Sequence, residues 1–284
     1  MVSYCAQETE ETHMTASMEQ IDLAVKIPHG ELEARVSIPT DFIPISSIVP
    51  VLRELGEKAQ SMEVTHSQKM GHTISCQKGC SACCQRFMVP VSPPEAFALT
   101  EVLDHLPDEH RMRVKSRLAT VLQRLKESNV FPTLLELGES PRQQSEEDLD
   151  SINRDYYALG VPCVFLENDV CSIYEHRPAA CREFLVSSPA ELCQDMVNNP
   201  IQQLPVPLRG GTVLSILWSD LMGGPVRLIP LPLAFAWADR HRSLQDRKWK
   251  GAELFDKALE SLGKFLNQVM APVSRETQEA GGQQ

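Results

Sequence analysis

Hydrophobic and mostly polar residues alternate over two stretches near the start of the chain. Residues 21–27 and residues 32–38 each carry a hydrophobic side chain at every second position. This period of two is typical of a strand with one buried face. His29-Gly30 suits a turn between the stretches, and Pro39 ends the second one. The pattern predicts a β-hairpin.

Helical spacing of hydrophobic residues follows over longer stretches. Ser92-Pro93-Pro94-Glu95 is typical of a helix start, because the serine can cap, the prolines suit the first turn and the glutamate completes a capping box. In residues 252–270, hydrophobic side chains recur along one helix face. We expect helices at residues 45–61, 92–105, 108–128, 149–159, 189–198 and 252–270.

The stretches between these helices carry shorter signals. Residues 138–150 are polar and acidic, which favours a loop. Two small strands are expected at residues 164–166 and 170–173, followed by a helical turn that begins at Pro178. The predicted fold class is therefore mainly α with a few short strands (α+β), with helices around an irregular cysteine-rich metal core.

The same patterns divide the chain into five parts. The expected division is a disordered tail (1–20), an N-terminal hairpin and helix (21–70), a cysteine-cluster metal-binding domain (71–200), a C-terminal helical extension (201–276) and a frayed tail (277–284).

Composition and charge exclude some classes of partner. The net charge is −11, from 38 acidic and 27 basic residues. Nucleic acids and anionic membranes both require a positive footprint, so neither is expected as a partner. No apolar stretch approaches the roughly 20 residues of a membrane span, and the acidic start lacks the pattern of an export signal. We therefore expect a cytoplasmic protein, in which nine cysteines indicate metal binding rather than disulfides.

Seven of these cysteines fall into two blocks and are the candidate metal ligands. Thiolates are soft donors that suit zinc and iron–sulfur chemistry. Seven exceed the four that one tetrahedral zinc or one cubane cluster needs, and neighbouring side chains such as Cys83 and Cys84 diverge. Both facts favour a polynuclear or two-centre site. The candidate ligands are Cys76, Cys80, Cys83, Cys84, Cys163, Cys171 and Cys181.

Four other residues near or outside the blocks are interpreted without a metal role. Cys5 lies in the predicted tail, and Cys193 on a predicted helix is interpreted as a buried free thiol. His72 is interpreted as a loop histidine, and His176 as a polar residue on a turn.

The two blocks resemble the YkgJ-type cysteine-cluster family of zinc- or iron-chelating proteins. The resemblance rests on Cys76-x3-Cys80-x2-Cys83-Cys84 and on the segment from Cys171 to Arg182, which contains IYEHRP and CR. It implies a metal cofactor, zinc or iron, with an iron–sulfur cluster as one form. Basic and hydroxyl side chains beside the cysteines can offset thiolate charge and donate hydrogen bonds to sulfur. The candidates are Tyr174, Arg177 and Arg182, with Lys78 and Arg86 in the first block.

Three functions remain open from the sequence. One is a metal-binding protein; another is a cluster-dependent enzyme, such as a redox enzyme or a protein lysine N-methylase, since the family includes flagellin lysine N-methylases. The third is an interaction module with a structural metal, and a protein partner or a homodimer is compatible with all three. The Cys76-x3-Cys80-x2-Cys83 spacing also occurs in radical enzymes that use S-adenosylmethionine, but Ala82 stands where they carry an aromatic residue.

Overall fold

The protein is described from a computed structural model that covers residues 17–143 and 145–270. It begins with the predicted hairpin: β1 (Met18–Ile27) pairs antiparallel with β2 (Gly30–Pro39) from Met18↔Pro39 to Ile27↔Gly30. Residues 18–20, predicted as tail, are therefore part of a strand. The rest of that predicted tail, residues 1–16, and the predicted tail at 277–284 lie outside the described residues.

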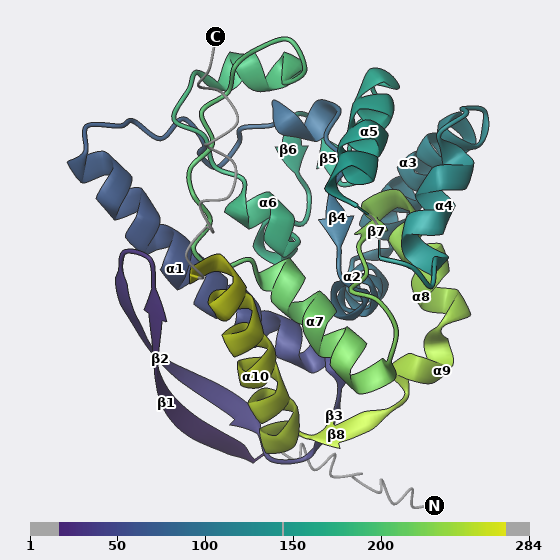
Figure 1. Cartoon of the computed structure of the whole chain (residues 1–284). Coiled ribbons are helices and arrows are strands. Elements are labelled where there is room, and N and C mark those ends of the chain that lie inside the picture. The colour runs from purple at the N-terminus through teal and green to yellow at the C-terminus, as the bar shows by residue number, and fades with distance from the viewer. Residues whose placement is uncertain (1–16, 144, 271–284) are drawn as a thin grey trace, which may run out of the picture.

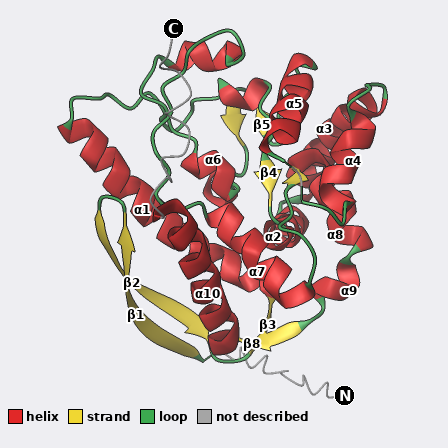
Figure 2. Ribbon diagram, viewed as in Figure 1, coloured by secondary structure: helices red, strands yellow, loops and turns green. Residues whose placement is uncertain are grey.

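The remaining described chain is mainly helical, which confirms the predicted fold class (Figure 2). Its other strands form three short antiparallel pairs: β3 (Phe42–Pro44) with β8 (Lys248–Lys250), β4 (Pro90–Val91) with β7 (Ile229–Pro230), and β5 (Leu166–Glu167) with β6 (Val170–Cys171). The α-helices are α1 (Val49–Lys69), α2 (Pro93–His105), α3 (Asp108–Lys126), α4 (Phe131–Glu139), α5 (Glu146–Ala158), α6 (Ala179–Glu183), α7 (Gly210–Met222), α8 (Leu231–Arg240), α9 (Arg242–Gln245) and α10 (Gly251–Met270). The 3-10 turns are η1 (Ile45–Ile48), η2 (Cys83–Gln85), η3 (Tyr174–His176) and η4 (Ala190–Asp195).

Several predicted helix boundaries are wrong. Residues 45–48 form η1, and α1 continues to Lys69. The predicted loop at 138–150 is shorter, because Ser145 accepts the N–H of Asp148 and caps α5 three residues before the predicted start. Residues 190–195 form a 3-10 turn rather than an α-helix. The helix α4 was not predicted at all.

One hydrophobic core joins the hairpin to the helices. Leu32, Val36 and Ile38 on β2 are buried where the strand packs on α1 and α10. At the centre, α2 packs on α7 and α8, and Phe97 contacts Trp218 and Trp237 at ring-centroid distances of 5.8 and 5.5 Å. Burying large side chains of this kind stabilises the fold by about 1.5–3 kcal/mol each. In Figure 1 the hairpin, α7 and α10 lie in the lower part, α1 runs up the left side, and the short elements β5, β6 and α6 lie above α7.

The first residue of α10 fits tightly against the hairpin. A Cβ atom on Gly251 would lie 1.6 Å from the carbonyl oxygen of Pro39. The N–H of this glycine donates to the carbonyl oxygen of Asp41 at 3.0 Å. The close approach of two backbones therefore requires glycine at this position.

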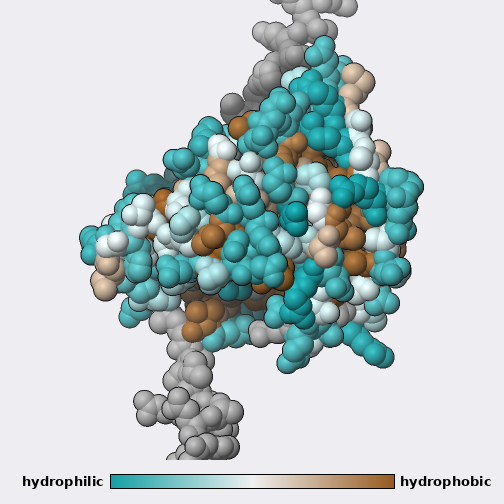
Figure 3. Space-filling view, turned by 90° about the horizontal axis from the view of Figure 1, so that it is seen from above, coloured by the Kyte–Doolittle hydropathy of each residue, from teal (hydrophilic) through white to brown (hydrophobic). Residues whose placement is uncertain are grey.

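One face of the molecule is mostly polar. On this face, shown in Figure 3, hydrophilic residues predominate and hydrophobic residues form separate patches. No helix in the described ranges has the length and apolar character needed to cross a bilayer.

Candidate metal centre

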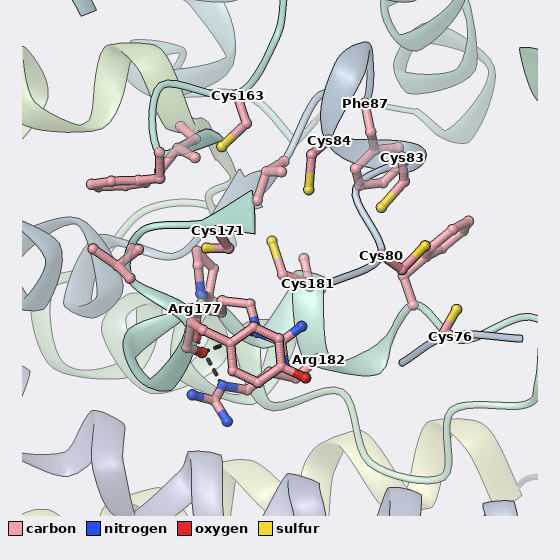
Figure 4. A pocket seen from close by; sticks show the side chains of 18 of the residues that line it. Cys76, Cys80, Cys83, Cys84, Phe87, Cys163, Cys171, Arg177, Cys181 and Arg182 are labelled. Carbon is pink, nitrogen blue, oxygen red and sulfur yellow. Dashed lines mark hydrogen bonds between the residues drawn. The ribbon is translucent and has the colours of Figure 1, made fainter. Parts of the chain in front are cut away.

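The fold brings the two cysteine blocks together around one cavity of about 120 Å³ (Figure 4). The backbones of the blocks are joined directly, because the N–H of Cys163 donates to the carbonyl oxygen of Cys84 at 2.8 Å. All seven predicted cysteines line the cavity: Cys76, Cys80, Cys83, Cys84, Cys163, Cys171 and Cys181.

Turns shape the first block. Gly79 has φ of +95°, a conformation that glycine adopts at low cost, and the N–H of Cys80 donates to the carbonyl oxygen of Gln77 at 3.0 Å. After this turn, η2 carries Cys83 and Cys84. The N–H of Phe87 closes the following turn on the carbonyl oxygen of Cys83 at 2.9 Å. Successive turns thus point closely spaced thiols into one region.

The second block consists of a tight hairpin and a short helix. Asn168 and Asp169 have φ of 49° and 60°, as a two-residue hairpin turn requires, and place Cys171 on β6. The predicted strands at 164–166 and 170–173 shrink to two residues each. Cys181 lies on α6, which follows Pro178 as predicted.

A buried carboxylate fixes α6 to the core. Glu95 accepts the N–H of Ala179 at 2.7 Å, and it also completes the predicted capping box with Ser92 on α2. At the other end of α6, Glu183 accepts the N–H of Gly210 at 2.6 Å, and burial raises the pKa of Glu183 to about 8. The helix that carries Cys181 is therefore held by side chains rather than by its own length.

The thiols form two neighbouring groups. In Figure 4 the sulfur atoms of Cys84, Cys163, Cys171 and Cys181 surround one space, and those of Cys83, Cys80 and Cys76 follow to one side. Charge interactions occur both within and between the groups: Cys163 is affected by Cys84 and Cys171, Cys76 by Cys80, and Cys83 by Cys84, Cys181 and Cys76. Cys83 and Cys84 connect the groups through a hydrogen bond between their side chains.

Most of these thiols resist ionisation without a bound cation. Burial raises the pKa of Cys76, Cys171 and Cys181, and that of Cys163 to about 12. The hydrogen bond from Cys83 lowers the pKa of Cys84 to about 7 and raises that of Cys83. A site that assembles so many thiols in a poorly solvated place is stabilised when a metal cation replaces their protons.

The predicted supporting residues lie beside the thiols. Tyr174, Arg177 and Arg182 all line the cavity. The positive charge of Arg177 opposes the effect of burial on Cys76, Cys171 and Cys181. Its guanidinium lies 3.7 Å from the ring centroid of Tyr174, and its Nε donates to the carbonyl oxygen of that residue at 3.0 Å. Within residues 17–143 and 145–270, neither arginine donates a hydrogen bond to sulfur.

The other basic candidates lie farther out. Lys78 pairs with Glu175 at 3.2 Å and lies over the ring of Tyr174 at 4.9 Å. Arg86 lies over the ring of Tyr157 at 5.7 Å and does not line the cavity.

The residues interpreted without a metal role lie at different places. Cys193 is 4% exposed, and its pKa is raised by burial and then by the charges of Cys76 and Cys80, which places it near the first block. His72 is exposed and does not line the cavity. His176 lines a different cleft, and Cys5 lies outside the described residues.

Sequence reasoning missed two kinds of group around the thiols. The N–H of Val186 donates to the sulfur of Cys76 at 3.3 Å, and a backbone donor carries no sequence signal. Apolar side chains complete the cavity wall: Phe87 and Phe165 lie close to the cysteines in sequence, whereas Leu231 comes from α8. Only the packing of the fold brings Leu231 there.

The donor set fits zinc or iron, although the side chains do not yet form a coordination shell. Thiolates select zinc, copper(I) and iron–sulfur clusters over harder cations. Among the described residues, no three side chains of His, Cys, Asp or Glu lie close enough to hold one ion. Binding therefore requires the thiols to turn inward. The cavity of about 120 Å³ is several times the roughly 10–15 Å³ that one water needs, so it leaves room for this closure.

Comparison with known proteins agrees with this chemistry. Residues 75–200 match the model of the CxxCxxCC family, described as a "putative zinc- or iron-chelating domain". No curated protein and no solved structure shows significant similarity to the chain. The matched residues include both cysteine blocks and all seven cysteines of the cavity. The part of the chain that carries both cysteine blocks is therefore similar to the CxxCxxCC family, whose description is that of a zinc- or iron-chelating domain.

Proposed function

We propose that this protein holds zinc or iron through the seven cysteines of the cavity, in a site with more than one metal ion. The observation that carries the proposal is that thiols from both blocks line a single cavity. Scattered structural cysteines would be buried separately, each among apolar side chains. The family description supports metal binding in general. Bound zinc would supply a Lewis acid, and an iron–sulfur cluster would supply electron transfer.

The number and grouping of the thiols support more than one ion. A tetrahedral zinc or a cubane cluster uses four thiolates. The cavity offers a group of four, with Cys84, Cys163, Cys171 and Cys181, and a second group of three beside it. Cys83 and Cys84 lie where the two groups meet, so either thiolate would be available to both groups.

The gathering of seven thiols in one cavity supports a reducing location. Thiols in such proximity oxidise readily in secretory compartments, whereas the cytoplasm keeps them reduced. We therefore infer a cytoplasmic protein.

Metal analysis of protein purified without oxygen tests the proposal. We expect more than one zinc or iron per chain by mass spectrometry; visible absorption would identify an iron–sulfur cluster, and colourless protein would identify zinc. Cys80→Ser and Cys181→Ser, one from each thiol group, should both lower the metal content.

Cys5→Ser is the matched control, because it removes a thiol that the sequence separates from both blocks. It should leave the metal content unchanged. If Cys80→Ser and Cys181→Ser also bind the full amount of metal, the cavity is not the metal site.

A further inference from the structure

A second cleft shares the turn η3 with the cysteine cavity. It has a volume of about 430 Å³ and is lined by residues of η1, α1, α2 and η3. We call it the η1–α2 cleft. Tyr174 of η3 lines the cysteine cavity, whereas His176 of the same turn lines the cleft. The volume falls within the roughly 300–1,000 Å³ typical of small-molecule sites.

The wall of this cleft contains an arginine that pairs with none of the described residues. Arg53 is half-buried, and across the described ranges its guanidinium makes no hydrogen bond or ion pair. Burial lowers the pKa of Arg53, and the charge of Glu95 opposes that effect. Glu95 is already used, since it accepts hydrogen bonds from Ser92 and Ala179. A half-buried guanidinium with five unused donors attracts an anion more strongly than a fully solvated one does.

A second guanidinium adds to the positive charge. Arg182 pairs with Glu57, and its Nε donates to the carbonyl oxygen of Arg177 at 3.0 Å. Unlike Arg53, it therefore already has acceptors for its donors. Arg53 and Arg182 both line a small neighbouring pocket, so the two guanidinium groups lie close enough to repel each other, and an anion at Arg53 would reduce that repulsion.

The rest of the cleft suits an apolar body next to the charge. Glu101 is the acidic residue on the wall, and its Oε1 already accepts from Ser46 at 2.7 Å and from Gln245 at 2.9 Å. His105 and His176 add imidazoles at the rim. Hydrophobic side chains from α1, from α2 and from the residue that follows α2 complete the surface: Val49, Pro50, Ala98, Val102 and Leu106.

We propose that the η1–α2 cleft binds a small organic anion, whose carboxylate pairs with Arg53 and whose short apolar body lies against these hydrophobic side chains. The site is separate from the cysteine cavity and does not depend on the proposed metal. Because Arg182 follows Cys181 directly, an occupant would also alter the charge close to the thiols.

Three probes of defined chemistry test this site on the full-length protein as isolated. Hexanoate carries both the carboxylate and the apolar body, n-hexylamine carries the opposite charge, and inorganic phosphate carries charge alone. Titration calorimetry should show saturable binding of hexanoate and weaker binding of the other two. Arg53→Met, which keeps the apolar stem, should weaken hexanoate binding about tenfold or more, because a charge-assisted pair is lost.

Arg242→Met is the matched control, since Arg242 is exposed and pairs with Asp239 away from the cleft. It should leave hexanoate binding unchanged, and Arg53→Lys should retain most of it. Thermal unfolding and metal content verify that each variant is folded. Absence of saturable hexanoate binding, equal binding by Arg53→Met, or tighter binding of n-hexylamine would overturn the proposal. Each of these results leaves the metal proposal untouched.

Discussion

The helical scaffold and the cysteine cavity differ in what holds their backbones in place. In the scaffold, α2, α7 and α10 are 13 to 20 residues long and bury continuous apolar faces. Around the cavity, η2, β5, β6 and α6 have two to five residues each. Elements this short do not persist alone, because helix nucleation and isolated strand pairing are unfavourable.

This difference indicates two sources of stability within one molecule. Hydrophobic burial suffices for the scaffold. The cavity relies on a few buried hydrogen bonds, such as that from Ala179 to Glu95, and by our proposal on a metal. The cavity backbone should therefore respond to metal removal and the scaffold should not.

Metal removal should have the largest effect. Structural zinc in small peptides contributes about 10–16 kcal/mol of binding free energy, which here would be lost from the cavity alone. After chelation under reducing conditions, amide hydrogen exchange should accelerate in residues 76–86 and 163–183 and remain slow in α7 and α10. If amide hydrogen exchange accelerates equally in both regions, the metal stabilises the scaffold as much as the cavity.

Gly251→Ala should have the next largest effect, and it should destabilise the helical scaffold rather than the cavity. The new methyl group would meet the carbonyl oxygen of Pro39, so α10 must move away from the hairpin. We expect a loss of about 3 kcal/mol in the free energy of unfolding, the upper end for overpacking. Unfolding by denaturant measures this loss. The metal content of the folded variant should be unchanged.

Gly263→Ala is the matched control, because it lies in the same helix and its Cβ would meet nothing within 4 Å. It should stabilise the protein by about 0.5–1 kcal/mol. A similar loss in both variants would contradict the close approach of the backbones.

Glu95→Gln tests the connection between the two regions. The carboxylate accepts hydrogen bonds from Ser92 and Ala179, and an amide group replaces one acceptor by a donor. The free energy of unfolding should fall by about 1–2 kcal/mol. Hydrogen exchange at α6 should also increase before metal is removed.

Glu109→Gln, at an exposed position in the first turn of α3, serves as the control and should change stability little. If Glu95→Gln leaves the exchange at α6 unchanged, the anchor between scaffold and cavity lies elsewhere.

Lys78→Ala should have the smallest effect. Lys78 and Glu175 form an ion pair in which both side chains are 72% exposed, and such pairs contribute about 0–1 kcal/mol. Metal content and the free energy of unfolding should stay close to the wild-type values. A clear loss of metal would show that Lys78 supports the site directly.

The same contrast explains what the sequence could predict. Alternation over residues 21–38 and the capping box at Ser92 predicted the hairpin and α2, because both signals act locally. The boundaries of α1 and α5 were wrong, since η1 and the cap at Ser145 replaced what periodicity alone favoured.

The cavity was predicted by residue type rather than by pattern. Spacing and thiol chemistry selected the seven cysteines that line it. Their arrangement depends on contacts between distant segments, such as the hydrogen bond from Cys163 to Cys84, which periodicity does not encode. The proximity of Cys193 to the first block and the unpaired Arg53 are likewise consequences of packing.

Cysteine-resolved alkylation, measured by mass spectrometry before and after chelation, shows directly whether the thiols of the cavity hold the metal. We expect protection in the metal-loaded protein and reaction after chelation for Cys76, Cys80, Cys83, Cys84, Cys163, Cys171 and Cys181, whereas Cys5 should react in both states. Comparing the two states of each thiol separates metal protection from burial. If these seven cysteines react at the same rates with and without the chelator, they do not hold the metal.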